Sequence, residues 1–179
     1  PELAIAGGWS CLHLLCMGRP ALGPVALELD ICGLATTHLR AMGSASAWLS
    51  ISRGNAGRAG AIFSCISDWI KCFLGQAQRL DLKAIVSSGL FEECVAAITA
   101  FAAGGTERLH DVNCWSLVSA MSLVRKCAGL HSCSSRIRSV ASALAFSLEH
   151  DLHFAEQLGL TSMSAAVQIV CKVFGRDEE

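Results

Sequence analysis

The stretch that decides the fold class is Ile137-Arg-Ser-Val-Ala-Ser-Ala-Leu-Ala-Phe-Ser-Leu148. Its apolar residues recur every three or four positions, which is the spacing of one face of an α-helix. From about Val25 onward the same helical spacing returns in segment after segment, and no convincing strand or hairpin pattern interrupts it. The sequence therefore predicts an all-α protein.

The composition narrows the classes of function. The chain has 179 residues, of which 53% are apolar and 16% are charged. This length is typical of one domain, and so low a charge content argues against disorder. The net charge of −1 provides no basic field that would attract nucleic acid or an anionic membrane surface. We therefore expect protein partners and no nucleic-acid partner.

Residues 1–26 form an N-terminal segment that is punctuated by glycine and proline. In this segment we expect one short helix, Leu3–Met17, followed by a break. The uncharged run Leu3–Gly18 is shorter than the roughly 20 residues that a membrane-spanning helix needs. A membrane-associated helical segment anchored through residues 3–17 remains the alternative function.

Residues 27–179 are expected to form one domain of stacked helices. Carboxylates that can cap a helix and glycines that can end one divide this part of the chain, as at Asp81 and Gly129. The helices predicted from the apolar spacing and these signals are Ala26–Met42, Ala59–Leu74, Leu82–Val86, Leu90–Phe101, Val112–Cys127, Arg136–Leu148, Leu152–Leu158 and Ser162–Phe174.

A weak internal repeat appears when the chain is compared with itself at an offset of 70 residues. The positions Ser64, Leu74, Asp81, Leu82, Gly89, Leu90 and Ala96 match Ser134, Leu144, Asp151, Leu152, Gly159, Leu160 and Ala166. The shared pattern is a long helix, a short capped helix, a break at Gly-Leu and another helix. Such a unit cannot bury its apolar face alone and must stack on a neighbour.

Two parts of the chain resemble the armadillo/HEAT family of α-solenoids. The carrying residues are Ile85-Val-Ser-Ser-Gly89-Leu90 with Val95–Phe101, and Ile137–Leu148 with Ala155–Leu160. The resemblance implies an armadillo-like α-solenoid fragment that acts as a non-enzymatic protein–protein interaction scaffold. Because the chain begins at Pro1 instead of Met, we expect it to be a segment of a larger protein.

Two features depart from the family pattern. The offset of 70 exceeds the roughly 40–47 residues of such repeats, so an extra helix at about 111–128 lies inside the unit. The position of the peptide-binding asparagine of the family is occupied by Phe146. An asparagine ladder that grips an extended peptide is therefore not expected.

In the resemblance, the helix that contains Phe146 lines the concave binding surface. The residues opposite its apolar stripe, together with the aromatic residue at the matching earlier position, are the candidate partner-binding residues: Trp69, Ser139, Ser142 and Phe146. Exposed aromatic side chains dominate many protein interfaces. Large aromatic side chains are usually buried, however, which favours the alternative that Trp69 and Phe146 pack against the extra helix.

No motif indicates a metal, a cofactor or catalysis. The possible ligand sets are Cys127/His131/Cys133, His110/Cys114 and His150/His153. None has the second ligand pair that a tetrahedral zinc site needs. The chain also lacks the GxSxG, HExxH and P-loop strings. We expect no metal, no cofactor, no small-molecule substrate and no enzymatic activity.

The remaining cysteines and basic residues have simpler explanations. The ten cysteines have irregular spacing without a CxxC pair, which suits free thiols in a reducing, intracellular compartment and predicts the cytoplasm. One local basic cluster contains Arg125, Lys126, Arg136 and Arg138. Basic side chains are favourable near helix C-termini, so we interpret this cluster as solvated helix ends.

Overall fold

Residues 2–19, 22–41, 66, 79–103, 114–150 and 152–175 are described by a computed structural model. Over these residues the chain is all-α and contains no strand, which confirms the predicted fold class. The helices are α1 (Glu2–Gly18), α2 (Leu22–Glu28), α3 (Ile31–Ala41), α5 (Arg79–Ser87), α6 (Leu90–Ala103), α7 (Cys114–Cys127), the 3₁₀ turn η2 (His131–Cys133), α8 (Ser134–His150) and α9 (Leu152–Phe174).

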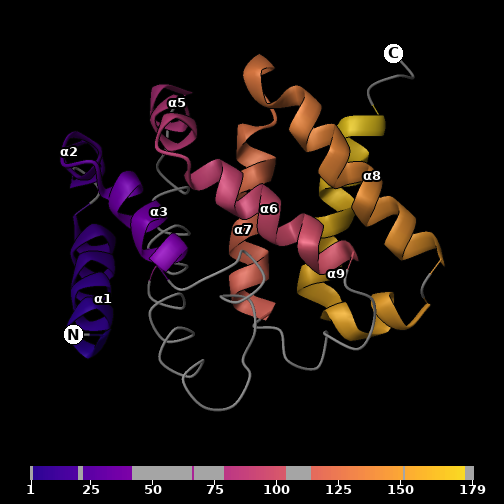
Figure 1. The fold of residues 1–179 in the computed structure, drawn as a ribbon, viewed down its shortest axis with the longest axis horizontal. Helices are drawn as coiled ribbons and strands as arrows, with labels where there is room; N and C mark the ends of the chain where they lie inside the picture. Colours follow the sequence, from indigo (N-terminus) through magenta and orange to yellow (C-terminus); the bar gives the residue numbers. More distant parts are fainter. Residues whose placement is uncertain are drawn as a thin grey trace.

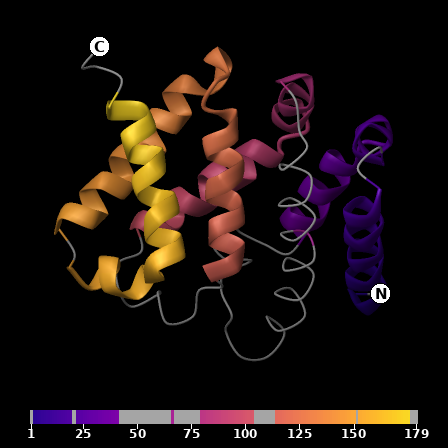
Figure 2. The ribbon, with the colours of Figure 1, turned by 180° about the vertical axis from the view of Figure 1, so that it is seen from behind.

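Helices α6 to α9 pack in two layers. Helices α6 and α8 face the viewer in Figure 1, whereas α7 and α9 face the viewer in Figure 2. Contacts join α6 to α8, α7 to α9 and the two layers to each other. The apolar stripe predicted for α8 explains this packing, because Ile137, Val140 and Leu144 are buried at the helical spacing.

The first helices extend this body at one end. Helix α3 packs on α6, α2 packs on α3 and α5, and α1 lies outermost against α2 (Figure 1). Trp9 of α1 belongs to the same hydrophobic cluster as Leu39 of α3 and Phe91 of α6. A hydrogen-bonded ion pair also joins α3 to α6, because Arg40 Nε donates to Glu93 Oε1 at 2.7 Å.

The predicted helix Ala26–Met42 is wrong, because the structure divides this region into α2 and α3. The division lies at Asp30, which adopts a left-handed backbone with φ 50°. Asp residues tolerate this conformation better than most. Asp30 Oδ1 then accepts a hydrogen bond from the Gly33 amide at 3.1 Å, which caps the first turn of α3.

Helix α2 also contains Pro24, in a region where the sequence predicts a break. Pro24 is the third residue of this helix. A proline is tolerated in the first turn because amides there have no intrahelical acceptor.

A second correction concerns the C-terminal helices. The sequence predicts two helices that are separated near Gly159, but the structure shows α9 as one continuous helix from Leu152 to Phe174. Phe154 and Leu158 before the glycine and Ile169 after it are all buried, so packing holds both halves in helical geometry. Figure 2 shows that α9 bends after its first turns instead of ending.

The two Gly-Leu steps of the internal repeat therefore differ in structure. Gly89 separates α5 from α6 and has φ 83°, whereas Gly159 lies within α9. Helix α5 begins at Arg79, two residues before Asp81, so Asp81 stands inside the helix instead of preceding it. The earlier long helix of the repeat, Ala59–Leu74, lies outside the described residues apart from Ile66.

The alternative function, a membrane-associated segment anchored through residues 3–17, can be compared with the length and apolar character of the helices. Among the described residues, no helix combines the length and the apolar character that crossing a membrane requires.

Candidate functional site

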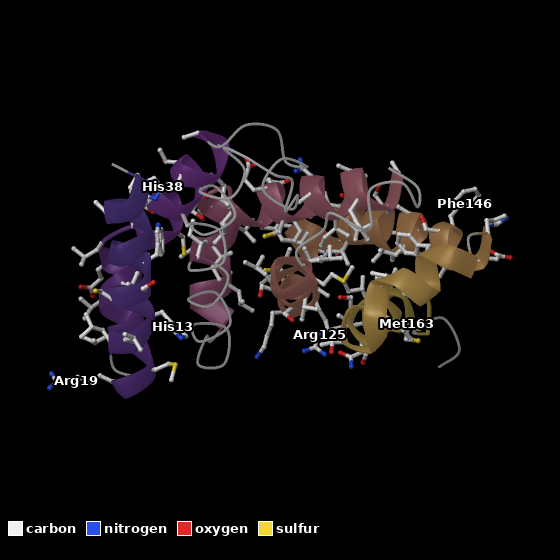
Figure 3. The ribbon with its side chains drawn as sticks, turned by 90° about the horizontal axis from the view of Figure 1, so that it is seen from below. His13, Arg19, His38, Arg125, Phe146 and Met163 are labelled. Atoms are coloured by element: carbon white, nitrogen blue, oxygen red, sulfur yellow. The ribbon has the colours of Figure 1, made fainter. Side chains whose placement is uncertain are left out.

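The candidate site lies on the solvent face of α8. Burial of one stripe of this helix leaves the opposite side exposed, including Ser139, Ser142 and Phe146. The stripe therefore determines which residues of α8 are available to a partner. Figure 3 shows Phe146 at the end of the molecule opposite α1.

Phe146 is exposed over 64% of its surface, and its ring stacks on the imidazole of His150 one turn later. The ring centroids are 4.3 Å apart and the planes are inclined by 19°. His150 Nδ1 lies 3.0 Å from the carbonyl oxygen of Phe146. Because a carbonyl oxygen only accepts, Nδ1 must carry the proton in this contact, which holds the imidazole beside the phenyl ring.

A groove of about 460 Å³ opens beside Phe146, between α8 and the last turns of α6. It is lined by Thr99, Ala102, Ala103, Ala143, Phe146, Ser147, His150 and Phe154. Small side chains form most of its walls, and the buried ring of Phe154 comes from α9. The groove is therefore chiefly apolar, with a few polar groups beside the apolar walls.

The two helices that flank the groove are joined by a hydrogen bond. Ser147 Oγ lies 3.0 Å from the carbonyl oxygens of Ala102 in α6 and Ala143 in α8, and the single hydrogen of its hydroxyl is shared between these two acceptors. Phe154 also packs against Phe101 with ring centroids 5.2 Å apart. These contacts fix the distance between the walls, so the groove is formed before any ligand arrives.

The structure separates the four predicted partner-binding residues into two groups. Ser139, Ser142 and Phe146 are exposed on α8, and only Phe146 lines the groove. The ring of Phe146 is mostly exposed, which speaks against the alternative in which this ring packs against the extra helix. Trp69 lies outside the described residues.

The possible metal-ligand sets lie only partly within the described residues. Among the described residues, no three His, Cys, Asp or Glu side chains lie together in an arrangement that holds a metal ion. Cys127 and Cys133 are buried whereas His131 is exposed. His110 and the side chains of Cys114 and His153 lie outside the described part.

The buried thiols are poor nucleophiles. Burial, with a smaller effect of the neighbouring Cys127 thiol, raises the pKa of Cys94 far above its usual range. Burial and the neighbouring Cys133 raise the pKa of Cys127 to about 12. Because the thiolate is the reactive form, Cys94 and Cys127 stay protonated and inert at neutral pH.

Two residues of the predicted basic cluster, Arg125 and Arg136, have separate partners. Arg125 at the end of α7 donates from Nη1 to Gln168 Oε1 of α9, and Lys172 donates from Nζ to the Arg125 carbonyl at 3.2 Å. Arg136 forms an ion pair with Glu92 of α6. Arg125 and Lys126 lie in the last turn of α7, as the interpretation of basic helix ends expects, whereas Arg136 lies in the first turn of α8.

Several residues of the groove were missed by the sequence analysis. His150 stands four positions after Phe146, a spacing that places two side chains on one helix face, so this neighbour was detectable. Thr99, Ala102 and Phe154 come from other helices and carry no local signal.

No protein-family model, curated protein or solved structure is found to match the chain.

Proposed function

We propose that this chain is a non-enzymatic protein-interaction scaffold, built as an armadillo-like stack of helices, that holds an apolar side chain of a partner protein in the groove between α6 and α8. The observation that carries the proposal is the exposed ring of Phe146 beside that groove. A partner that covers this exposed ring gains the free energy of removing its apolar surface from water.

The partner chemistry follows from the walls of the groove. Methyl groups of Thr99, Ala102 and Ala143 and the ring of Phe154 favour an aliphatic or aromatic anchor. Phe146 then covers one side of the anchor, and Ser139 and Ser142 of the same helix are available for polar contacts outside the groove. We expect one anchor residue to account for most of the binding energy.

The compartment is part of the proposal. Cys94, Cys127 and Cys133 are buried cysteines that form no disulfide, and thiols persist in this form where the cell is reducing. We therefore propose that the scaffold works inside the cell, in the cytoplasm.

A display selection tests the proposed groove. Random linear peptides are selected on the immobilised 179-residue chain, and the enriched peptides are measured against wild type, Phe146→Ala and Phe174→Ala by fluorescence anisotropy. Phe174 is the matched control, because it is also an exposed phenylalanine but lies at the end of α9. We expect a shared apolar anchor, a loss of affinity of about tenfold or more in Phe146→Ala, and no change in Phe174→Ala.

Two results contradict the proposal. Peptides that bind Phe146→Ala as tightly as wild type do not use this groove. A selection in which no peptide is enriched on wild type over Phe146→Ala shows that the groove is not a peptide site.

A further inference from the structure

Helix α1 carries a continuous exposed stripe on the side opposite to its buried Trp9. The stripe consists of Ala4, Gly7, Gly8, Cys11, Leu14, Leu15 and Gly18. These positions recur at intervals of three and four residues, so they lie along one face of the helix. Figure 3 shows α1 at the edge of the molecule, where nothing drawn covers its outer side.

The C-terminal half of this stripe exposes large apolar side chains. Leu14 is 65% exposed and Leu15 is 55% exposed. Between Leu3 and Gly18 the helix has no Asp, Glu, Lys or Arg that would solvate the surface around them. Arg19, one turn after Leu15, is the first charged residue beyond this run. Adjacent exposed leucines on a face that carries no charge from Leu3 to Gly18 indicate a surface that another molecule covers.

The N-terminal half of the stripe has no large side chains, and the described residues do not fill the space beside its glycines. A Cβ atom built on Gly7 or Gly8 would meet no atom within 4 Å. Glycine is unfavourable in a helix interior, and no contact within the described part of the chain explains two adjacent glycines there. Small residues on a helix surface allow the backbone of a second helix to approach closely.

The half of the stripe with large side chains and the half with glycines are placed symmetrically on either side of Cys11. Leu15 and Gly7 are each four residues from Cys11, and Leu14 and Gly8 are each three residues from it. When two copies of α1 cross antiparallel at Cys11, Leu15 of each copy therefore meets Gly7 of the other. In the same arrangement Leu14 meets Gly8, and the two Cys11 residues face each other across the axis.

We propose that α1 is a self-association surface, on which a second copy of this chain packs antiparallel around a two-fold axis at Cys11. A two-fold interface requires a patch that is complementary to itself, and the symmetric placement of leucines and glycines satisfies this requirement. A lipid surface is the weaker candidate for the same face, because its contacts gain nothing from glycines at matched distances. A single helix pair is a small interface, so we expect a dissociation constant on the order of micromolar.

Glycine substitutions give the sharpest test, because the dimer and the isolated chain respond in opposite directions. In Gly7→Ala/Gly8→Ala the added methyl groups fill open space in the single chain and favour helix, so Tm at low concentration rises by about 4–8 °C. In the dimer the same methyl groups separate the helices. We expect the dissociation constant from sedimentation equilibrium to increase by about tenfold or more.

The leucines provide a second pair of variants. Leu14→Ala removes a side chain that fills the facing glycine hollow and should weaken association by about tenfold. Val167→Ala is the control, because Val167 is a similarly exposed apolar residue on α9 at the other end of the molecule. This variant should associate like wild type.

Cross-linking tests the geometry directly. Diamide takes one hydrogen atom from each of two thiols, is reduced to its hydrazine and leaves one Sγ–Sγ bond. A disulfide needs Cα atoms about 4.4–6.8 Å apart, which the proposed crossing at Cys11 provides. We expect a covalent dimer of twice 18.9 kDa whose cross-linked peptide joins Cys11 to Cys11. It should be absent in Cys11→Ser and retained in Cys171→Ser, which removes another exposed thiol.

Three results overturn the proposal. One is a chain that stays monomeric at high micromolar concentration and sediments with phosphatidylcholine vesicles, which assigns the face to lipid. Another is a dimer that Gly7→Ala/Gly8→Ala and Leu14→Ala do not weaken. The third is a covalent dimer that forms equally well in Cys11→Ser. None of these results bears on the groove at Phe146, which lies at the opposite end of the molecule.

Discussion

The indole Nε1 of Trp9 donates a hydrogen bond to Nδ1 of His38 across 3.0 Å, and this contact joins α1 to α3. The two rings meet edge to face, with centroids 6.0 Å apart and planes inclined by 81°. An indole nitrogen only donates, so Nδ1 of His38 is the unprotonated nitrogen and the imidazole proton lies on Nε2. The contact orients the outermost helix of the array against the rest of the protein.

We predict that Trp9 and His38 are energetically coupled. In a double-mutant cycle of Trp9→Phe and His38→Phe, the loss of the hydrogen bond should appear as a coupling of about 0.5–1.5 kcal/mol in the free energy of unfolding. Urea unfolding of the four proteins measures it. Strictly additive losses would show that Trp9 stabilises α1 through burial alone.

The turn between α5 and α6 provides the second prediction. Gly89 has φ 83°, and a Cβ atom there would lie 3.2 Å from Nη2 of Arg40. Gly89→Ala combines left-handed strain with this close contact and should lower the free energy of unfolding by about 1–2 kcal/mol. Gly129→Ala is the control, because a Cβ there meets no atom within 4 Å. Equal stability of the two variants would show that α5 and α6 relax around the new side chain.

The helices with a strong apolar period were predictable from the sequence. The expected ranges Leu90–Phe101, Val112–Cys127 and Arg136–Leu148 differ from α6, α7 and α8 by two residues at most at either end. These helices end at signals that act locally, such as the glycine after Cys127. The local signal at the end of α7 predicted the correct last residue, Cys127, because no contact with another helix extends the helix beyond it.

The two wrong boundaries have different causes, one local and one from packing between helices. The break at Asp30 depends on a carboxylate that caps α3, and the continuity of α9 through Gly159 depends on burial of residues on both sides. A glycine costs only about 1 kcal/mol in a helix, and packing exceeds this amount without leaving a signal in the local sequence.

The candidate site was predictable only in part, for a similar reason. The stripe of α8 specifies which face bears Ser139, Ser142 and Phe146, since burial of one side exposes the other. The groove needs Thr99 from α6 and Phe154 from α9 as well. Which helices lie beside α8 is a property of the tertiary fold, and the spacing within one helix does not contain it.

We predict that Phe146 contributes little to stability although it is a large aromatic residue. Phe146→Ala should change the free energy of unfolding by no more than about 0.5 kcal/mol, because its ring is mostly exposed. Leu144→Ala, two residues earlier in the buried stripe of the same helix, should cost about 2–5 kcal/mol. Chemical unfolding compares the two, and a large loss in Phe146→Ala would place the ring in the core.

The buried thiols make the protein sensitive to alkali. Burial raises the pKa of Cys127 to about 12, and that of Cys94 rises for the same reason. Below about pH 9 these thiols are protonated in both states, and the stabilisation is complete. Above this pH the unfolded chain loses the protons while the folded chain keeps them. The free energy of unfolding should therefore fall by up to about 1.4 kcal/mol per pH unit for each buried thiol, until the folded-state pKa is reached.

Urea unfolding between about pH 8 and pH 11 measures this slope. Cys127→Ala should make the slope shallower, because it removes one of the thiols that lose their proton in the unfolded chain but keep it in the folded chain. Cys171→Ala removes an exposed thiol of α9 and should leave the slope unchanged. Iodoacetamide provides an independent check, since the native protein should be alkylated at Cys11 and Cys171 well before Cys94 or Cys127. A slope that Cys127→Ala and Cys171→Ala alter equally, with alkylation of Cys127 in the native protein, would show that solvent reaches this part of the core.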